Sequence, residues 1–390
     1  MSQDRYTEVT HQSWFSRIGG ALKGILFGLL LFVLAFPLLF WNEGRAVKRA
    51  KSLTEGSKVV LSVSADSVDP ANEGQLIHVS GTATTDAVLT DPVFGVSENA
   101  LKLKRTVEMY QWKESKETET RTKVGGGEET ITTYSYSKTW SQSHINSENF
   151  TRPAGHQNPG SMPYDSTVLT ADKITLGAFT LSPSLAGKIS QYEPLPVEAD
   201  QPLPQPVRDS GQVHNGGYYL GKDPADPRIG DVRIQFQVTR PTPVSVVARQ
   251  VGSTFEPYRA KAGGEVELLQ TGIHSADAMF EQAQQSNRVI TWLLRLGGFL
   301  LIMIGLNLMT RVFSVLADVI PLFGRIVGAG TRLIAFLLAA VFSLITIAVA
   351  WVFFRPLLGI LLLTAAGGLI AIVVIKLRSS KVEKTSTPVD

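Results

Sequence analysis

The stretch GILFGLLLFVLAFPLLFW (24–41) decides the fold class of this 390-residue chain. A bilayer core about 30 Å thick is crossed by about 20 apolar helical residues, and this run is close to that length. Three more apolar runs follow in the last hundred residues, at 289–309, 333–354 and 357–375. A helix satisfies its own backbone in lipid. The sequence therefore predicts an α+β membrane protein with four transmembrane helices, one N-terminal and three C-terminal.

The polar stretch between the first two runs, 42–288, predicts a large β-dominated domain. It contains alternating segments rich in β-branched and aromatic residues, such as DVRIQFQV (231–238) and PVSVVARQV (243–251). This stretch holds 25 basic against 29 acidic residues, whereas the rest of the chain holds 12 against 5. Such a mildly acidic domain lacks the basic footprint of a nucleic-acid-binding protein. The chain has no cysteine, which excludes disulfides and thiolate metal sites.

Charge near the apolar runs predicts the orientation, because short basic loops stay on the cytoplasmic side. The tail 376–390 is basic, and the connection 310–332 carries three arginines. These charges predict a cytoplasmic N-terminal arm and interfacial lead-in at 1–23, a cytoplasmic tail, and an extracytoplasmic domain. The basic residues directly after the first run favour the opposite orientation: Arg45, Lys48, Arg49 and Lys51. The first run ends in bulky residues, so it is expected to remain as an anchor rather than to be cleaved.

Polar residues within the C-terminal runs are the first candidate site. Arg295 and Asn307 lie in the second run, where a charged group costs several kcal/mol unless it pairs or reaches the interface. We expect Arg295 to extend to the nearer interface and Asn307 to bond a neighbouring helix. A transport path is the alternative, although few polar residues accompany them. Asp318 and Arg325 interrupt 310–332, which predicts a cytoplasmic interfacial segment, an amphipathic hairpin rather than a further span.

A second candidate is a two-stranded hairpin within 113–140. The polar alternating segments ETETRTKV and ETITTYSYS flank three glycines at 125–127, which predicts a flexible tip. Tyr134, Tyr136 and Trp140 lie on its second strand and make it a candidate contact arm. The alternative is a solvated ribbon without a partner.

The sequence contains no recognisable catalytic motif. None of the six histidines forms an HExxH pair, and the GxSxG and Walker A patterns are absent. Carboxylates are numerous, but their spacing selects no acid–base pair. We therefore expect no catalytic residues, no metal site, no cofactor and no enzymatic activity.

Segments in order along nearly the whole chain carry a resemblance to a known family, among them FWNEGRAVKRAKSLTEG (40–56), LKLKRTVEMYQWKE (101–114), GLNLMTRVFSVLADVIPLF (305–323) and WVFFRPL (351–357). They resemble the transmembrane protein 43 family, also called LUMA. The resemblance implies a large domain in the lumen of the endoplasmic reticulum and nuclear envelope, or in the periplasm of bacteria. Eukaryotic members resemble organisers of the inner nuclear membrane, which self-associate and bind lamin-linked membrane proteins. The short N-terminal arm and absent cysteine favour a bacterial member, in the inner membrane.

Two functions follow as hypotheses. The first is a non-enzymatic membrane scaffold that acts through self-association and protein contacts of its extracytoplasmic domain. Its partners would be the lipid bilayer, a second copy of the chain and other membrane proteins, with no nucleic acid. The second is a lipid- or small-molecule-handling protein, even an enzyme, with a pocket where the domain meets the bilayer beside Arg295. A channel or transporter is disfavoured, because polar residues in the apolar runs are scarce.

Overall fold

The computed structural model describes residues 4–198, 204–208, 211–357 and 364. The described residues form two compact units. The β-rich unit comprises Met1–His11, Ser52–Arg121 and Glu129–Ala283. The helical unit comprises Gln12–Lys51, Thr122–Glu128 and the described residues from Gln284 onward.

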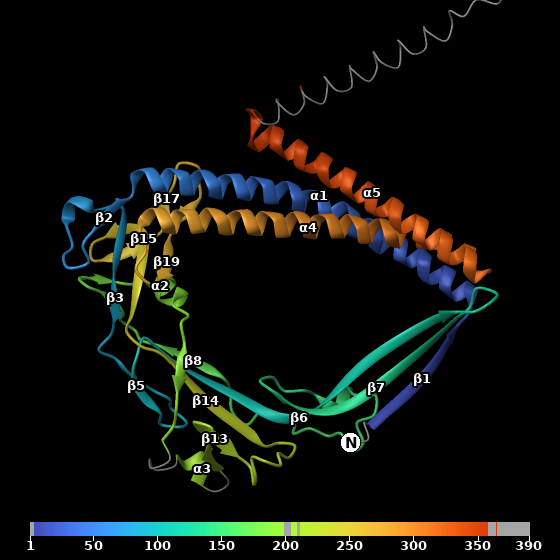
Figure 1. The fold of residues 1–390 in the computed structure, drawn as a ribbon, viewed down its shortest axis with the longest axis horizontal. Helices are drawn as coiled ribbons and strands as arrows, with labels where there is room; N and C mark the ends of the chain where they lie inside the picture. The colour runs from blue at the N-terminus through green and yellow to red at the C-terminus, as the bar shows by residue number, and fades with distance from the viewer. Residues whose placement is uncertain (1–3, 199–203, 209–210, 358–363, 365–390) are drawn as a thin grey trace, which may run out of the picture. The chain divides into compact units, whose positions relative to one another are not determined.

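Three long helices supply the helical unit, and Figure 1 shows them running alongside one another. They are α1 (Trp14–Val59), α4 (Ala276–Ala317) and α5 (Pro321–Phe354). Within the described residues, these three are long and apolar enough to cross a membrane. The chain is therefore an α+β integral membrane protein with a large β-rich unit. Apart from Leu357 and Thr364, the predicted fourth helix at 357–375 lies outside the described residues, as does the tail 376–390.

The helices extend well beyond the predicted apolar runs. Helix α1 contains 24–41 and continues for more than four turns past Trp41, because good helix formers follow the apolar run. Residues 310–332 are divided between the end of α4 and the beginning of α5 rather than forming a separate segment. Only Asp318–Ile320 interrupts the helices there, and Pro321 begins α5 at a position where its missing N–H is not needed.

In the middle of the helical unit, α1 and α4 approach closely through glycines. A Cβ built on Gly28 would lie 2.6 Å from the carbonyl oxygen of Gly305, and one built on Gly305 would lie 2.7 Å from that of Gly28. Beside this crossing, Ala35, Leu39 and Ile302 form an apolar core with Ala339 of α5. Small residues of this kind allow membrane helices to pack backbone against backbone.

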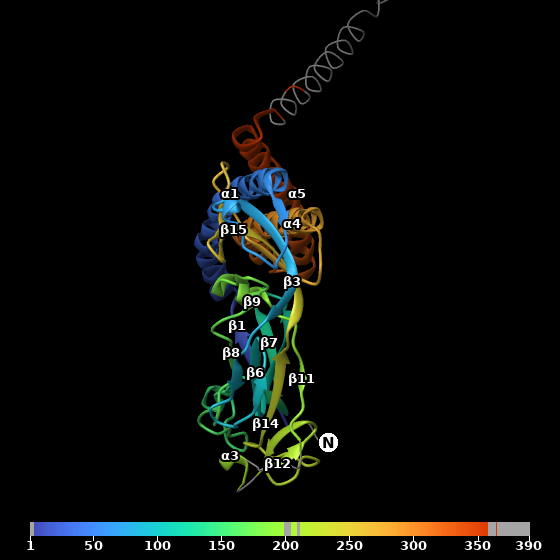
Figure 2. The same ribbon diagram turned by 90° about the vertical axis from the view of Figure 1, so that its left-hand side faces the viewer.

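Two main sheets build the β-rich unit, as Figures 1 and 2 show from two sides. The described strands of the first sheet follow the order β1-β7-β6-β14-β13-β12, with β11 on β14 and β8 on β6. Their bounds are β1 Asp4–Gln12, β6 Lys102–Thr122, β7 Glu128–Ser141, β8 Thr167–Thr170, β11 Glu193–Leu195, β12 Gly211–His214, β13 Gly217–Leu220 and β14 Val232–Thr239. Alternate residues of β6 and β14, such as Val107 opposite Ile234, face a core that includes Phe94.

The described strands of the second sheet follow the order β19-β15-β16-β10-β9-β3-β2, and β15 also pairs with β3. Their bounds are β2 Leu61–Val63, β3 Leu76–Thr84, β9 Thr175–Leu176, β10 Phe179–Thr180, β15 Thr242–Val251, β16 Thr254–Glu256 and β19 Leu268–Thr271. Val79 lies opposite Val246, over a core that contains stacked Phe179 and Phe255. Small ladders join β4 (Val88–Thr90) to β5 (Ser97–Asn99) and β17 (Tyr258–Arg259) to β18 (Glu265–Val266). The short helices are α2 (Pro183–Lys188), α3 (Gln205–Arg208) and the 3₁₀ turns Pro70–Asn72 and Ser147–Asn149.

The N-terminal strand differs most from expectation. The sequence predicts that 1–23 and 42–288 lie on opposite sides of the bilayer, yet β1 pairs with β7 in one sheet of the β-rich unit. Tyr6 stacks on Tyr134 with ring centroids 6.1 Å apart, and Asp4 lies 2.9 Å from His156 Nε2. A bilayer does not pass between neighbouring strands of one sheet. Strand β1 is therefore part of the same sheet as β7, and this pairing is at odds with the expected separation of 1–23 from 42–288 by the bilayer.

The predicted hairpin is present, with β6 and β7 joined through residues 123–127. The amide of Lys123 donates to the carbonyl of Gly127 at 2.8 Å. Gly125 and Gly126 have φ angles of 92° and 79°, which glycine adopts without steric cost. The glycines therefore make the turn itself, as the sequence predicts.

The glycine crossing gives the first prediction. Gly28→Ala should lower the unfolding free energy by about 1–3 kcal/mol, because the new methyl group collides with the backbone of α4. Gly20→Ala is the matched control on the same helix, since its Cβ would meet nothing within 4 Å. The control should be neutral or stabilising by up to about 1 kcal/mol. Unfolding in detergent micelles measures both, and equal stability of the two variants would contradict the close crossing.

Candidate functional site in the helical unit

A buried ion pair joins α4 to α1. Arg295 Nε donates to Glu43 Oε1 at 2.6 Å, and Arg295 Nη2 donates to Glu43 Oε2 at 2.9 Å. The Glu43 side chain is fully buried, and that of Arg295 is 13% exposed. Two parallel bonds between a guanidinium and a carboxylate form the strongest ordinary geometry for such a pair.

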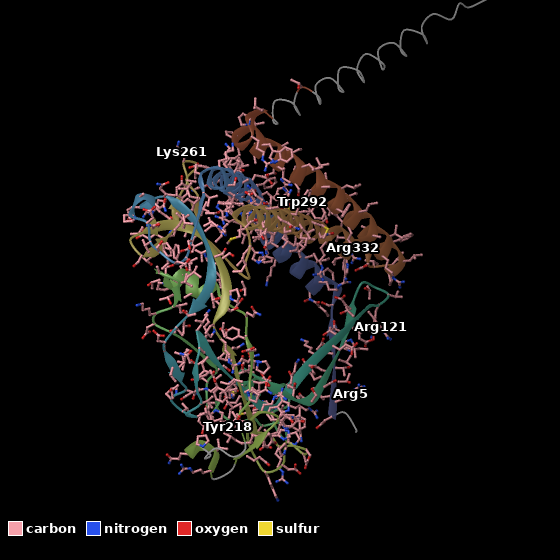
Figure 3. The ribbon with its side chains drawn as sticks, turned by 60° about the vertical axis from the view of Figure 1, so that its left-hand side comes forward. Arg5, Arg121, Tyr218, Lys261, Trp292 and Arg332 are labelled. Carbon is pink, nitrogen blue, oxygen red and sulfur yellow. The ribbon has the colours of Figure 1, made fainter. Side chains whose placement is uncertain are left out.

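Aromatic residues enclose this pair. Trp351 of α5 donates its indole N–H to Glu43 Oε2 at 2.8 Å, so all three helices meet at one carboxylate. The guanidinium carbon of Arg295 lies 4.7 Å from the ring centroid of Trp292, which Figure 3 labels on α4, and 5.7 Å from that of Trp351. Cation–π contacts of this kind stabilise an arginine that is removed from water.

A hydrogen-bond network continues from the ion pair along α1 and α4. Asn42 Nδ2 donates to the carbonyl of Thr291 at 3.1 Å, and Arg45 donates to the Thr291 hydroxyl at 3.1 Å. Arg45 also donates to Asn287 Oδ1 at 3.1 Å, while Asn287 Nδ2 donates to the carbonyl of Ala46 at 3.0 Å. Buried polar groups stabilise a structure when they are satisfied in this way.

The structure gives Arg295 and Asn307 partners that the sequence did not name. Arg295 pairs with Glu43 on the neighbouring helix. Asn307 Nδ2 donates to the carbonyl of Met303 on its own helix, at 2.9 Å, rather than to a neighbour. Sequence reasoning missed Glu43, although a charged residue in an apolar run calls for an opposite charge nearby.

A second ionic cluster lies where α4 turns into α5. Arg17 Nη2 donates to Asp318 Oδ2 at 2.5 Å, and Arg17 Nε lies 3.3 Å from Glu128 Oε2. Arg17 Nη1 also donates to the carbonyl of Gly126 at 2.6 Å, so the hairpin tip belongs to this cluster. Arg17 and Asp318 are each 7% exposed. The candidate residue Asp318 is thus a buried partner of Arg17.

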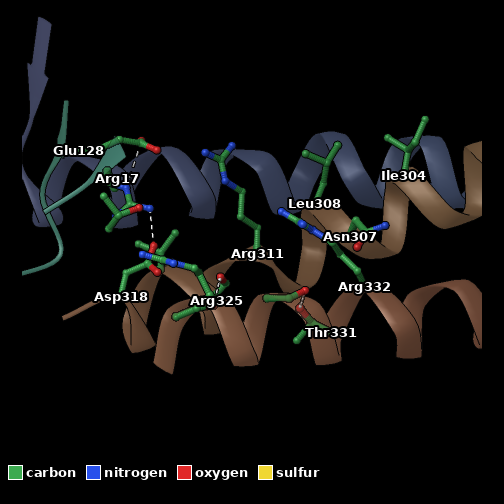
Figure 4. Close-up of a pocket in the computed structure, with 15 residues that line it drawn as sticks. Arg17, Glu128, Ile304, Asn307, Leu308, Arg311, Asp318, Arg325, Thr331 and Arg332 are labelled. Carbon is green, nitrogen blue, oxygen red and sulfur yellow. Dashed lines mark hydrogen bonds and ion pairs between the residues drawn. The ribbon is translucent and has the colours of Figure 1, made fainter. Parts of the chain in front are cut away.

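A cavity of about 570 Å³ opens beside this cluster. Figure 4 shows Arg17 at one end, beside Glu128, and Ile304 at the other, with Arg332 and Asn307 close to each other before that end. The lining residues are Arg17, Thr122, Glu128, Ile304, Asn307, Leu308, Arg311, Ser314, Val315, Asp318, Gly324, Arg325, Gly328, Thr331 and Arg332. Four of them are arginines and two are acids, which gives the lining a formal charge of +2. The structure therefore brings together Asn307, Asp318 and Arg325, whereas Arg295 lies elsewhere.

Small residues hold α4 against α5 at this cavity. Ser314 donates its hydroxyl to the carbonyl of Gly324 at 3.1 Å. A Cβ on Gly324 would lie 1.6 Å from Asp318 Oδ1, and one on Gly328 would lie 2.9 Å from Ser314 Oγ. Glycine at 324 therefore leaves room for the carboxylate that binds Arg17.

The candidate contact-arm residues lie in the β-rich unit and pack against that unit. Tyr136 stacks on His156 at 3.9 Å and donates its hydroxyl to Glu114 Oε2 at 2.7 Å. Burial, together with the Glu114 carboxylate that accepts this hydrogen bond, raises the pKa of Tyr136 to about 12. Trp140 lies under the guanidinium of Arg233, 4.6 Å from ring centroid to Cζ. With Tyr134 stacked on Tyr6, these three rings contribute to the structure of the hairpin.

Comparison with known proteins assigns the family. The model of the family described as Transmembrane protein 43 matches residues 109–356, which is more than half of the chain. The chain belongs to the transmembrane protein 43 family. It is 38% identical to Transmembrane protein 43 of Mus musculus over 371 residues, which is 91% of each chain. The Homo sapiens protein is 38% identical over 90% of this chain and 89% of its own. A Drosophila melanogaster homolog is 32% identical over 87% and 91% respectively.

Membership in the transmembrane protein 43 family agrees with the apolar helices and indicates no reaction. These three relatives are animal proteins, so they give no support to a bacterial assignment. No solved structure matches the chain. Within the described residues, no group of three or more His, Asp and Glu side chains is placed to hold a metal ion.

The buried pair gives the second prediction. Glu43→Gln leaves the Arg295 charge buried without a counter-charge and should cost about 3–5 kcal/mol of unfolding free energy. Replacing both residues by methionine should cost less than either single change, because no unpaired charge remains. Unfolding in detergent micelles, followed by tryptophan fluorescence, measures these losses.

Glu119→Gln is the control for this prediction, since its pair with Arg121 has side chains 60% and 63% exposed. That loss should stay below about 1 kcal/mol. A Glu43→Gln variant as stable as the control would show that the pair contributes little.

Proposed function

We propose that the chain is a non-enzymatic integral membrane scaffold. In this proposal the helical unit anchors the protein in the bilayer, and the β-rich unit binds a second copy of the chain and other membrane proteins. The observation that carries it is the position of β1 at the end of the first sheet. An edge strand leaves a row of backbone N–H and C=O groups available to another strand.

The composition of β1 favours pairing with a second copy. Seven of its nine residues are exposed, so its outer edge is accessible. Two copies of one edge pair antiparallel about a two-fold axis, the commonest symmetry of homo-oligomers. One such register places the two copies of Thr7 opposite each other at the axis, and a Thr–Thr pair across two strands is favourable. The charged residues also disfavour indiscriminate edge pairing.

The alternative is a lipid- or small-molecule-handling protein with a pocket beside Arg295. The surroundings of Arg295 do not favour it. Glu43 and the two tryptophans occupy the space around the Arg295 guanidinium. The cavity at the α4–α5 turn does not include Arg295 among its lining residues.

We place the part of the β-rich unit that follows α1 on the non-cytoplasmic side of the membrane. This would be the lumen of the endoplasmic reticulum or nuclear envelope in a eukaryotic cell, or the periplasm in a bacterial one. Four basic residues in the tail 376–390 support a cytoplasmic tail. Arg311, Arg325 and Arg332 are weaker markers, because they line a cavity between helices rather than a loop.

Cross-linking tests self-association, and the absence of cysteine makes single-cysteine variants unambiguous. Thr7→Cys, in the centre of β1, should give covalent dimers with a short bismaleimide in intact membranes. Val88→Cys is the control, because its side chain is 63% exposed on a separate two-stranded ladder of the same unit. Equal yields for the two variants, or no dimer with Thr7→Cys, would contradict pairing through this edge.

Single-cysteine variants also test sidedness. In vesicles sealed with the cytoplasmic face outward, an impermeant maleimide should label Glu117→Cys only after permeabilisation, and Thr7→Cys in the same assay reports the side of β1. Labelling of both in sealed vesicles would overturn the non-cytoplasmic placement while supporting a shared side. Labelling of Thr7→Cys alone would show that β1 and the hairpin are separated by the bilayer, against the strand pairing.

A further inference from the structure

We propose that the cavity at the α4–α5 turn binds the phosphate-bearing headgroup of an anionic phospholipid. Its volume of about 570 Å³ lies within the range of about 300–1,000 Å³ that is usual for small-ligand sites. The proposal concerns a ligand of the helical unit and is independent of pairing through β1.

The acidic residues that line the cavity neutralise only part of its positive charge. Arg17 is already matched by Asp318 and Glu128. Arg311, Arg325 and Arg332 line the same space, and no ion pair or hydrogen bond joins their side chains to any part of the described chain. Three guanidinium groups are therefore available to an anion. The planar guanidinium binds two phosphate oxygens at once, which makes arginine the preferred residue for phosphate.

The arginines line one cavity because of helix geometry. Arg325 and Arg332 are seven residues apart, which is two turns, so they project from the same face of α5. Arg311 faces them from α4, and Ser314, one turn further along that helix, bonds to the Gly324 carbonyl of α5. That bond and the small residues of α5 fix the two helices around the cavity.

A lipid fits the site better than a soluble phosphate, because the lining is amphiphilic. Ile304 and Leu308 form an apolar part of the wall beside the polar groups. Outside the cavity, the neighbouring turns carry exposed apolar side chains that lie in helices apolar enough to enter a bilayer, among them Phe313, Leu316, Leu322, Phe323 and Ile326. Arginines at the boundary of such helices reach the headgroup level. Basic pockets between membrane helices are typical sites for anionic headgroups.

Charge also predicts the headgroup class. Phosphatidylcholine and phosphatidylglycerol both carry a phosphate, but choline adds a positive charge. The net charge of +2 in the cavity repels choline and attracts a headgroup whose only charge is the phosphate. Anionic phospholipid should therefore bind more tightly than zwitterionic phospholipid with the same acyl chains.

Native mass spectrometry of the full-length protein, released from detergent with added lipid, tests the proposal. Palmitoyl-oleoyl phosphatidylglycerol should bind at least about tenfold more tightly than palmitoyl-oleoyl phosphatidylcholine, since one charged hydrogen-bonded contact is worth about this factor. Equal affinity for the two lipids overturns the proposal without the need for any variant. Inorganic phosphate at millimolar concentration should not displace the lipid. Displacement by phosphate would identify a soluble anion site instead and also overturn it.

Variants locate the site. Arg325→Gln/Arg332→Gln should reduce phosphatidylglycerol binding by about tenfold or more and leave phosphatidylcholine binding unchanged. Arg311→Gln, on the other helix, should lower it independently and provides a second test if the double variant does not fold. Arg355→Gln is the matched control on the chain that follows α5, because Arg355 does not line the cavity. Loss of binding in the control equal to that in the cavity variants would show that general surface charge, not this cavity, holds the lipid.

Discussion

The ion pair between Glu43 and Arg295 is the interaction on which the helical unit depends. An unpaired charge among apolar helices costs several kcal/mol, so neither residue is tolerable there alone. Together they form two parallel hydrogen bonds, and Trp351 adds a third bond to the carboxylate. These bonds hold α1, α4 and α5 in one alignment along their axes. An apolar contact between helices would not do this, because a slide of one turn brings one leucine into the place of another.

A second ionic cluster fixes the other part of the unit. Arg17 binds Asp318 and the carbonyl of Gly126, which ties the beginning of α1 to the α4–α5 turn and the hairpin tip. Between the two clusters, α1 and α4 cross at Gly28 and Gly305. The polar clusters therefore select the alignment, and the glycine crossing supplies close packing. This division explains why residues so costly to place in an apolar environment recur at several points of the helices.

The sequence predicts the parts of this fold that depend on local pattern. Apolar runs reveal three of the helices, and alternation with three glycines reveals the β6–β7 hairpin. Partners distant in the chain leave no such signal. Strand β1 pairs with residues more than a hundred positions away, and nothing within DRYTEVTHQ (4–12) indicates that partner. Likewise Arg295 is conspicuous in its apolar run, whereas Glu43 follows another run among ordinary polar residues. The Arg17–Asp318 pair was missed for the same reason.

The arginines of 310–332 have a structural setting that the sequence pattern does not reveal. The rule for loop charges treats each basic residue as a marker of the cytoplasmic side. In the structure Arg325 and Arg332 belong to a helix and, with Arg311, line a cavity, which gives them a different reason to be present. A count of loop charges takes no account of this cavity. Side-chain placement therefore has to be known before these arginines can be read as markers of orientation.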